Sequence, residues 1–283
     1  MLGCYSRVLP FNHNVDERIK VMKPWYDNYC FAEEEYGKTT MYNSVMVLNF
    51  LDKYIRNNYD IPKNMVESNV RIDYDKVCML IRHDKEFAHD ASIIQQLVTQ
   101  GFVTGKLVEN FPAERINDPD NFLSLLFYFG MVTIDGDYKG VTKFIIPNEV
   151  VRDQMYTYLL DTYKENDLTY DSFNKGKLES QLAYDGNYKA YFEFIADSLK
   201  RYSSQRDKQK GEAFVHGFTL AMTSQNQFYR PISELDNDGG YADIFLSPLC
   251  DIVKESVKTT KLHKLVVIYR GAEMVMCEEV TEE

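Results

Sequence analysis

The chain has 283 residues, 45% of them hydrophobic, which is enough for two domains of ordinary size with a substantial apolar core. Its net charge of −11 argues against a surface that binds duplex nucleic acid throughout, because such binding relies on Lys and Arg displacing counterions from phosphates. Five scattered cysteines without a Cys-x-x-Cys pair argue against a disulfide framework or a zinc site and favour a reducing cytoplasm.

The N-terminal part starts with an aromatic-rich segment followed by a well-marked helix. Residues 24–31 place four aromatic side chains beside a proline. Asn43 and Ser44 are suited to cap a helix. The apolar side chains that follow recur at helical spacing: Val47, Leu48, Leu51 and Ile55. This pattern predicts an amphipathic helix over residues 45–54. Two further helices are predicted over residues 74–81 and 93–98, the second ended by Gly101.

The sharpest pattern begins at Asp118-Pro119, which predicts a helix start. The apolar positions of this helix are Phe122, Leu125, Leu126 and Phe129. Two short strands are predicted over residues 131–134 and 141–146, joined by a hairpin turn at Asp135-Gly136, and another helix from Asn148. The order of helix, hairpin and helix is typical of a winged helix. Because the segment is acidic to neutral, we favour a protein-packing role over a DNA-reading wing.

The middle of the chain is predicted to be a helical linker. Residues 161–186 are rich in Tyr, Asn, Asp and Lys and contain few aliphatic side chains. An amphipathic helix follows, marked by Phe192, Ile195, Leu199 and Tyr202. We therefore expect a mostly helical, winged-helix-like domain over residues 1–165, a linker over 166–190, and a second domain over 191–283.

The second domain contains two acidic residues that suggest a catalytic site. A helix is predicted from Gly211, with Glu212, His216 and Thr219 on one face and an apolar core face opposite. A strand is predicted over residues 241–246, in which Asp243 interrupts an otherwise apolar sequence. Buried there, Asp243 would need a metal, a cation or a set of donors, since an unpartnered buried carboxylate costs several kcal/mol.

A Glu on a helix and an Asp on the neighbouring strand are half of a metal-dependent nuclease site. Oxygen ligands of this kind hold Mg²⁺, which polarises a phosphodiester and lowers the pKa of a bound water. The other half is an acidic residue, any residue, and then Lys on the next strand. No Glu-x-Lys occurs, and the one Asp-x-Lys, residues 137–139, lies in a predicted turn. The alternative is that a basic side chain such as Arg230 or Lys264 pairs with Asp243.

Other sites are not indicated. No histidine has metal-ligand spacing with another His or Cys, and no Gly-Lys pair has the leading glycine of a P-loop, so no ATP binding is expected. No apolar run reaches the ~20 residues of a membrane helix, and the N-terminus has no signal pattern, so we expect a cytoplasmic protein without a membrane partner. Residues 200–270 carry 11 basic and 8 acidic side chains, which makes nucleic acid a possible partner of this segment and a protein the alternative.

Several short motifs follow one another in a defined order: residues 23–29, 42–44 with Val47-Leu48, 118–122, 211–214, and 262–264 with 267–271. Together they resemble a bacterial family that joins an AAA-ATPase-like region to a C-terminal PD-(D/E)xK nuclease-like domain. The resemblance covers the chain from about Asp16. It implies an α+β protein in which residues 1–165 are the winged-helix-like part of the ATPase-like region and residues 191–283 are an incomplete nuclease-like α/β domain.

The resemblance also assigns the site. Glu212 matches the family's helix Glu, and Asp243 matches its metal-binding Asp, so both are candidate catalytic residues and Asp243 is the candidate Mg²⁺ ligand. The family's P-loop core is absent, and the strand with Glu-x-Lys and the helix after it are missing between about residues 251 and 257. We therefore expect Mg²⁺-dependent hydrolysis of nucleic acid as the ancestral activity, lost here; the alternative is a non-catalytic module that binds protein or nucleic acid. Because the central strand is missing, we expect residues 265–269 to pair directly with residues 241–246.

Overall fold

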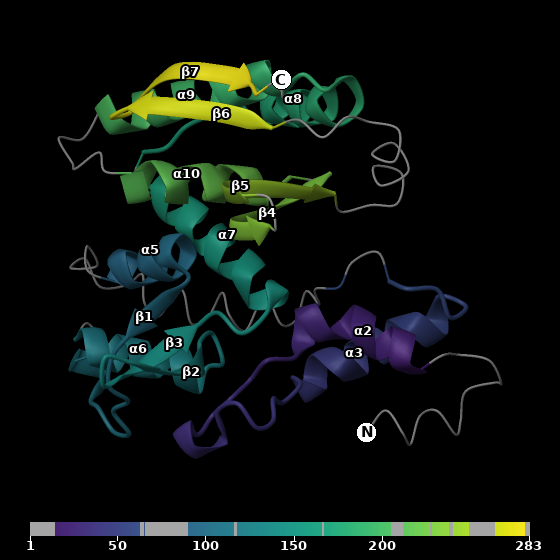
Figure 1. The fold of residues 1–283 in the computed structure, drawn as a ribbon, viewed down its shortest axis with the longest axis vertical. Coiled ribbons are helices and arrows are strands. Elements are labelled where there is room, and N and C mark those ends of the chain that lie inside the picture. Colours follow the sequence, from purple (N-terminus) through teal and green to yellow (C-terminus); the bar gives the residue numbers. More distant parts are fainter. Residues whose placement is uncertain are drawn as a thin grey trace. The chain divides into compact units, whose positions relative to one another are not determined.

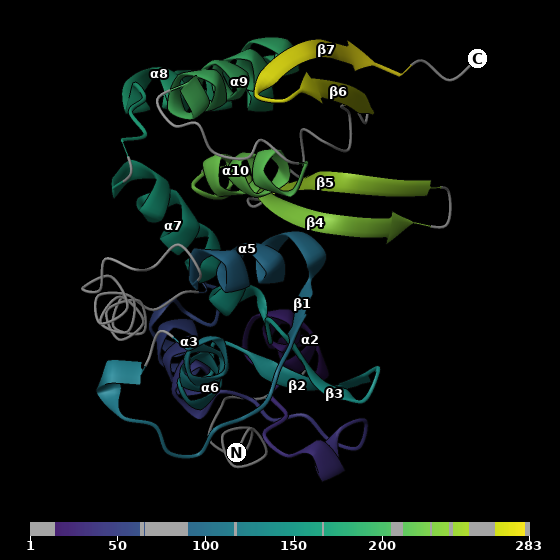
Figure 2. The same ribbon diagram turned by 90° about the vertical axis from the view of Figure 1, so that its left-hand side faces the viewer.

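The structure is a computed structural model, and it describes residues 15–62, 65, 90–115, 118–165, 167–204, 212–226, 228–237, 240–248 and 264–280. Helices and small antiparallel sheets make up these ranges, so the protein is of the α+β class, as predicted (Figures 1 and 2). The chain divides into two compact units. Unit 1 is Met1–Asp90 with Phe102–Gln154, and unit 2 is Ala91–Gly101 with Met155–Glu283.

The helices of unit 1 include both well-marked helices of the sequence. They are α2 (Val15–Tyr26), α3 (Ser44–Arg56), α6 (Pro119–Tyr128) and the start of α7 (Glu149–Glu165), with 3-10 turns at Glu33–Glu35 and Ala113–Arg115. Pro119 is the first residue of α6, where its missing N–H costs no helical hydrogen bond. The helix predicted over residues 74–81 lies outside the described residues.

Helix α3 is confirmed together with its cap. The side-chain oxygen of Asn43 accepts hydrogen bonds from the N–H groups of Val45 and Met46, at 3.1 and 3.2 Å. The buried face is shifted from the predicted one, since Leu48 and Ile55 are exposed. The buried side chains are Met46, Val47, Phe50, Leu51 and Tyr54. The two aromatic residues in this set add bulk to a face that the aliphatic spacing alone had placed elsewhere.

Three short strands form the sheet of unit 1 in the order β1-β3-β2, all antiparallel: β1 (Phe102–Thr104), β2 (Thr133–Tyr138) and β3 (Val141–Ile145). The predicted hairpin is confirmed, but its turn lies at Lys139-Gly140 and not at Asp135-Gly136. Asp137 stabilises the later turn, because its Oδ1 accepts a hydrogen bond of 2.8 Å from the N–H of Gly140. Gly136, with φ of +86°, lies instead at the bulge in β2.

The aromatic-rich segment of residues 24–31 is attached to the rest of unit 1 by its backbone. The N–H of Cys30 donates to Thr133 Oγ1 at 2.6 Å, and that hydroxyl donates to the carbonyl of Cys30 at 3.0 Å. The amide of Asn148 donates to the carbonyl of Asp27 at 3.1 Å. The segment is therefore tied both to β2 and to the residue before α7. The order α6, β2, β3, α7 agrees with the predicted order of elements, while the winged-helix assignment stays a prediction.

Unit 2 contains the helices α5 (Asp90–Gln100), the rest of α7, α8 (Ser172–Asp185), α9 (Tyr188–Ser204) and α10 (Glu212–Ser224). The predicted helices over residues 93–98, 192–202 and from residue 211 are confirmed. Helix α8 occupies the segment expected as a linker, and it packs against α9 within unit 2. The units therefore divide the chain at other points than the ranges predicted from the sequence.

The strands of unit 2 form two separate hairpins: β4 (Tyr229–Asn237) with β5 (Gly240–Pro248), and β6 (Leu265–Arg270) with β7 (Glu273–Glu279). The expectation that residues 265–269 pair with residues 241–246 is wrong for the described residues. Each strand pairs with its neighbour in sequence, because a short turn such as Gly271-Ala272 costs far less closure entropy than a long connection. Helix α10 lies along β4, and α9 lies along β7 (Figures 1 and 2).

Aromatic side chains fill the interior of unit 2 where α7, α9 and α10 meet. The ring centroids of Tyr163 and Phe218 are 5.4 Å apart, and those of Tyr202 and Phe218 are 6.0 Å apart. Burial raises the pKa of Tyr163 above its ordinary value, because the phenolate would be far from water. Across the parts of the chain that the structure describes, none of the helices has the length and apolar character needed to cross a membrane.

Candidate functional site

The first candidate residue, Glu212, lies in the first turn of α10 and is exposed. The helix enters the interior from Gly217 onward, and Thr219 on the predicted polar face is only 5% exposed. A Cβ at residue 217 would lie 3.3 Å from Thr99 Cγ2 of α5, tighter than ordinary contact, so glycine allows the close approach of the two helices. The polar face of α10 is therefore limited to its first turn and His216.

The second candidate residue, Asp243, lies on β5 with an exposed side chain. The register pairs Ile244 with Ser233 and Leu246 with Pro231 across the β4–β5 hairpin. The expectation of a carboxylate buried in an apolar strand is therefore wrong. One face of this two-stranded hairpin packs against α10, and the other face is open to water. Asp243 can keep its charge there without a buried partner.

His216 connects the two elements that carry these acidic residues. Its Nε2 lies 3.1 Å from the backbone carbonyl oxygen of Asp243 and 3.4 Å from Ser233 Oγ. With a proton on Nε2, the ring donates to that carbonyl and fixes the hairpin on the helix. The sequence places His216 on the face of Glu212 but gives no sign of this contact, because the histidine binds the main chain of Asp243 and not its carboxylate.

The side chains around Asp243 do not form a complete metal site. Within the described ranges, no group of three or more His, Cys, Asp or Glu side chains is arranged to hold an ion. No ion pair between Asp243 and a basic side chain is formed within these ranges, so the alternative pairing with Arg230 or Lys264 is not formed there; both basic side chains have other interactions. Within these ranges the donor set does not make up a Mg²⁺ site of the kind a nuclease requires; residues 249–263 lie outside the described residues.

The basic side chains of residues 200–270 lie partly within the described residues and partly outside them. Six of these side chains lie outside the described residues: Arg206, Lys208, Lys210, Lys254, Lys258 and Lys261. Of the others, Lys200 donates a 2.8 Å hydrogen bond to Glu273 and is exposed. The positive charge of residues 200–270 thus stays a property of the sequence, without a described surface patch.

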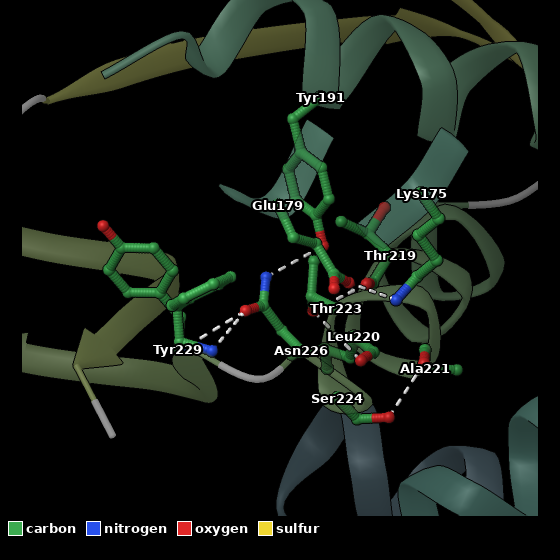
Figure 3. Close-up of polar contacts among 11 residues, drawn as sticks. Lys175, Glu179, Tyr191, Thr219, Leu220, Ala221, Thr223, Ser224, Asn226 and Tyr229 are labelled. Carbon is green, nitrogen blue, oxygen red and sulfur yellow. Dashed lines mark hydrogen bonds and ion pairs between the residues drawn. The ribbon is translucent and has the colours of Figure 1, made fainter. Parts of the chain in front are cut away.

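A buried polar cluster of unit 2 lies elsewhere, between α8, α9 and the end of α10. Lys175 and Glu179 form an ion pair one turn apart on α8, with side chains 7% and 5% exposed. Figure 3 shows this pair beside Tyr191 and Asn226. Asn226 Nδ2 lies 3.5 Å from the Tyr191 hydroxyl, while its Oδ1 accepts a 2.8 Å hydrogen bond from the N–H of Phe228 at the start of the β4–β5 hairpin.

Burial dominates the electrostatics of this cluster. It raises the pKa of Glu179 above its ordinary value, although the hydrogen bond and the charge of Lys175 both act to lower it. Burial also raises the pKa of Tyr191, and the nearby charge of Glu179 adds to this. Because the charged groups satisfy each other and little solvent reaches them, the cluster is suited to hold α8 in place and not to bind a ligand.

Nothing in the residue pattern indicates this cluster. Lys175 and Glu179 are four residues apart, a spacing far more common on solvated helix faces than in a core. The surrounding residues 161–186 contain few aliphatic side chains, which pointed to a linker. The buried side of α8 is made by the stems of its polar residues and by Tyr191 on α9, and a hydrophobic pattern does not detect such contacts.

Comparisons of the chain with models of protein families, with curated proteins and with solved structures found no match. Membership in the ATPase-plus-nuclease family therefore stays a prediction based on the motifs of the sequence. The catalytic assignment of Glu212 and Asp243 stays a prediction as well.

Proposed function

We propose that this protein is a catalytically incomplete relative of the ATPase-plus-nuclease family, and that unit 2 acts as a protein-interaction module. The observation that carries the proposal is the exposure of Asp243. An exposed carboxylate is hydrated and needs no metal ion to stabilise its charge. The physical reason for expecting a bound ion at this strand is thereby removed.

The incomplete set of side chains supports the same conclusion. In-line hydrolysis needs an ion held by several oxygens and a cation close to the attacking water. Asp243 is the candidate ligand and Glu212 the residue expected to assist it, and no lysine of the described ranges forms an ion pair with Asp243. The ion would therefore depend on ligands that the described chain does not supply.

The contact between His216 and the main chain of Asp243 has a structural role. It joins α10 to the β4–β5 hairpin at the strand that would carry the metal ligand. A rigid helix and hairpin that present exposed side chains can bind a partner without performing chemistry. Non-catalytic binding therefore requires nothing beyond the described contacts.

A nuclease assay tests the proposal. Wild-type protein, Asp243→Ala and Glu212→Ala are incubated with supercoiled plasmid, single-stranded DNA and RNA in the presence of Mg²⁺ or Mn²⁺. We expect no cleavage above buffer for any of the three proteins, and equal cleavage by all three would indicate a contaminating nuclease. Cleavage by the wild type that is lost in Asp243→Ala would overturn the proposal.

Fluorescence anisotropy with labelled oligonucleotides tests the nucleic-acid alternative. We expect no saturable binding near physiological salt, because the chain carries a net charge of −11. Saturable binding whose affinity falls steeply as salt rises would instead favour a nucleic-acid-binding module that acts through residues 200–270.

A further inference from the structure

The β6–β7 hairpin has one covered face and one open face. Its inward side chains include Cys277, which is buried where β7 lies along α9. Four exposed β-branched side chains mark the other side: three lie at outward positions of the register and its continuation, and Val275 is the extra residue at the bulge in β7; we call them the outer face of the hairpin. They are Val266, Ile268, Val275 and Val280, with exposed fractions of 38%, 44%, 49% and 46%.

Single exposed apolar residues are normal, but a cluster on one small element is not. The register places Val266 opposite Glu278 and Ile268 opposite Met276, so these four side chains share one surface. The pairing of the two strands continues after β7, where the N–H of Val280 donates a 2.7 Å hydrogen bond to the carbonyl of Lys264. A hairpin of two strands is marginally stable alone and gains stability when both faces are covered. The outer face is thus suited to contact another apolar surface.

Charged side chains at the two ends of the outer face suggest what that surface is. Arg270 lies at the turn end, and Glu278 lies at the open end. Neither forms an ion pair with another described residue, whereas Glu273 at the turn end already binds Lys200. The Lys200 hydrogen bond and charge, with a smaller contribution from Arg270, lower the pKa of Glu273. The turn end therefore has a positive charge to offer, and the open end a negative one.

We propose that the outer face binds the same face of a second copy of this chain. A two-fold axis would set the hairpins antiparallel, so that Arg270 of each copy meets Glu278 of the other and the aliphatic side chains pack between the two ion pairs. Arg270 and Glu278 lie about four residues apart along the hairpin, or ~13 Å, which separates the two pairs well. This inference rests on the proposed function and names the partner as a second copy.

The interface would be small. Two six- to seven-residue strands bury less area per copy than the ~800 Å² of a standard interface, so we expect a weak dimer that forms in the micromolar range. Sedimentation velocity of the full chain from ~1 to ~100 µM should show a shift from monomer to dimer. A wild type that stays monomeric throughout this range overturns the proposal.

Variants test the surface and its geometry. Ile268→Lys should abolish the dimer, while Val45→Lys, at a valine on α3 that is 57% exposed, should leave it unchanged. A dimer that survives Ile268→Lys overturns the proposal. Arg270→Glu and Glu278→Arg should each weaken the dimer at least about tenfold through like-charge contacts, and the double variant should restore it. Failure of the double variant to restore the dimer overturns the antiparallel arrangement.

This test separates the two proposals. Metal-dependent cleavage lost in Asp243→Ala would overturn the non-catalytic function while leaving the concentration dependence of sedimentation unaffected. A monomer without nuclease activity would overturn the second-copy inference alone. Unchanged thermal unfolding of Ile268→Lys shows that its effect is on association and not on folding, because residue 268 is exposed in the single chain.

Discussion

Two carboxylates of unit 2 have opposite environments. Glu179 on α8 is buried with Lys175, whereas Asp243 on β5 is exposed and has no basic partner among the described residues. The sequence pointed to the other assignment, because Asp243 stands among apolar residues and Glu179 among polar ones. The burial of a residue depends on which other elements pack against it. The residues next to it in the sequence do not determine those contacts.

The difference bears on function as well as on stability. A buried charge contributes to folding mainly through the penalty that appears when its partner is removed. An exposed charge on an edge hairpin contributes little to folding and is free to be used in binding. We therefore expect substitutions at the Lys175–Glu179 pair to act on stability and substitutions at Asp243 to act, if at all, on function.

The largest effect is expected for Lys175→Met. Removing the ammonium group leaves Glu179 buried without its counter-charge, which should lower the free energy of unfolding by about 3–5 kcal/mol. Chemical denaturation measures this. The matched control is Lys38→Met, which breaks the exposed pair with Glu35 and should change stability by less than about 1 kcal/mol.

A second variant keeps that experiment informative. The double variant Lys175→Met with Glu179→Leu should recover most of the loss, because no unpaired charge is then left in the core. Equal stabilities of Lys175→Met and Lys38→Met would contradict the buried environment of the pair.

The next effect is a pH dependence of stability. Burial raises the pKa of Glu179, so the folded state holds this proton more tightly than the unfolded state, whose ordinary value is 4.5. Its contribution is therefore most favourable below the ordinary pKa and is lost as the pH rises through the raised pKa. Denaturation of the wild type and of Glu179→Gln from about pH 4 to about pH 7 should show the wild type losing stability relative to the variant. A relative gain with rising pH would contradict the direction of this shift.

A smaller effect is expected at the cap of α8. The carboxylate of Asp171 accepts hydrogen bonds from the N–H groups of Phe173 and Asn174, at 2.9 and 3.0 Å. Asp171→Ala should cost about 1 kcal/mol, whereas Asp171→Asn keeps an acceptor and should cost less. Thermal unfolding of the two variants measures the difference. No difference between Ala and Asn would indicate that α8 does not depend on this cap.

The smallest effect is expected for Asp243→Ala. An exposed side chain without an ion pair should change the free energy of unfolding by less than about 0.5 kcal/mol. Glu179→Ala, measured under the same conditions, should be destabilised by several kcal/mol. Similar losses for the two variants would remove the distinction between the two carboxylates.

Local signals in the sequence were sufficient for much of the fold. Asn43 caps α3, Pro119 begins α6 and Gly101 follows α5, because each of these residues acts on its own helix end. The pairing of strands was not indicated by signals of this kind. Three strands, β1, β4 and β7, were not predicted, and the expected partner of residues 265–269 was wrong because the adjacent hairpin forms at a smaller entropic cost.

The candidate site could be predicted in its positions but not in its environment. Glu212 and Asp243 lie on a helix and on a strand as the sequence indicates, yet the exposure of Asp243 depends on the number of strands beside β5. The contact of His216 with the main chain of residue 243 depends on how α10 lies against the hairpin. Neither the exposure of Asp243 nor the contact of His216 follows from residue spacing, since both arise from packing between elements.

Manganese binding tests the central claim most directly. Electron paramagnetic resonance of free Mn²⁺ is recorded during titration of the wild type, Asp243→Ala and Glu212→Ala. We predict the same weak, non-saturating binding for all three proteins, because the exposed carboxylate does not belong to a complete ligand set among the residues that the structure describes. One tightly bound ion in the wild type that is absent from both variants would contradict this and would restore the metal-dependent enzyme.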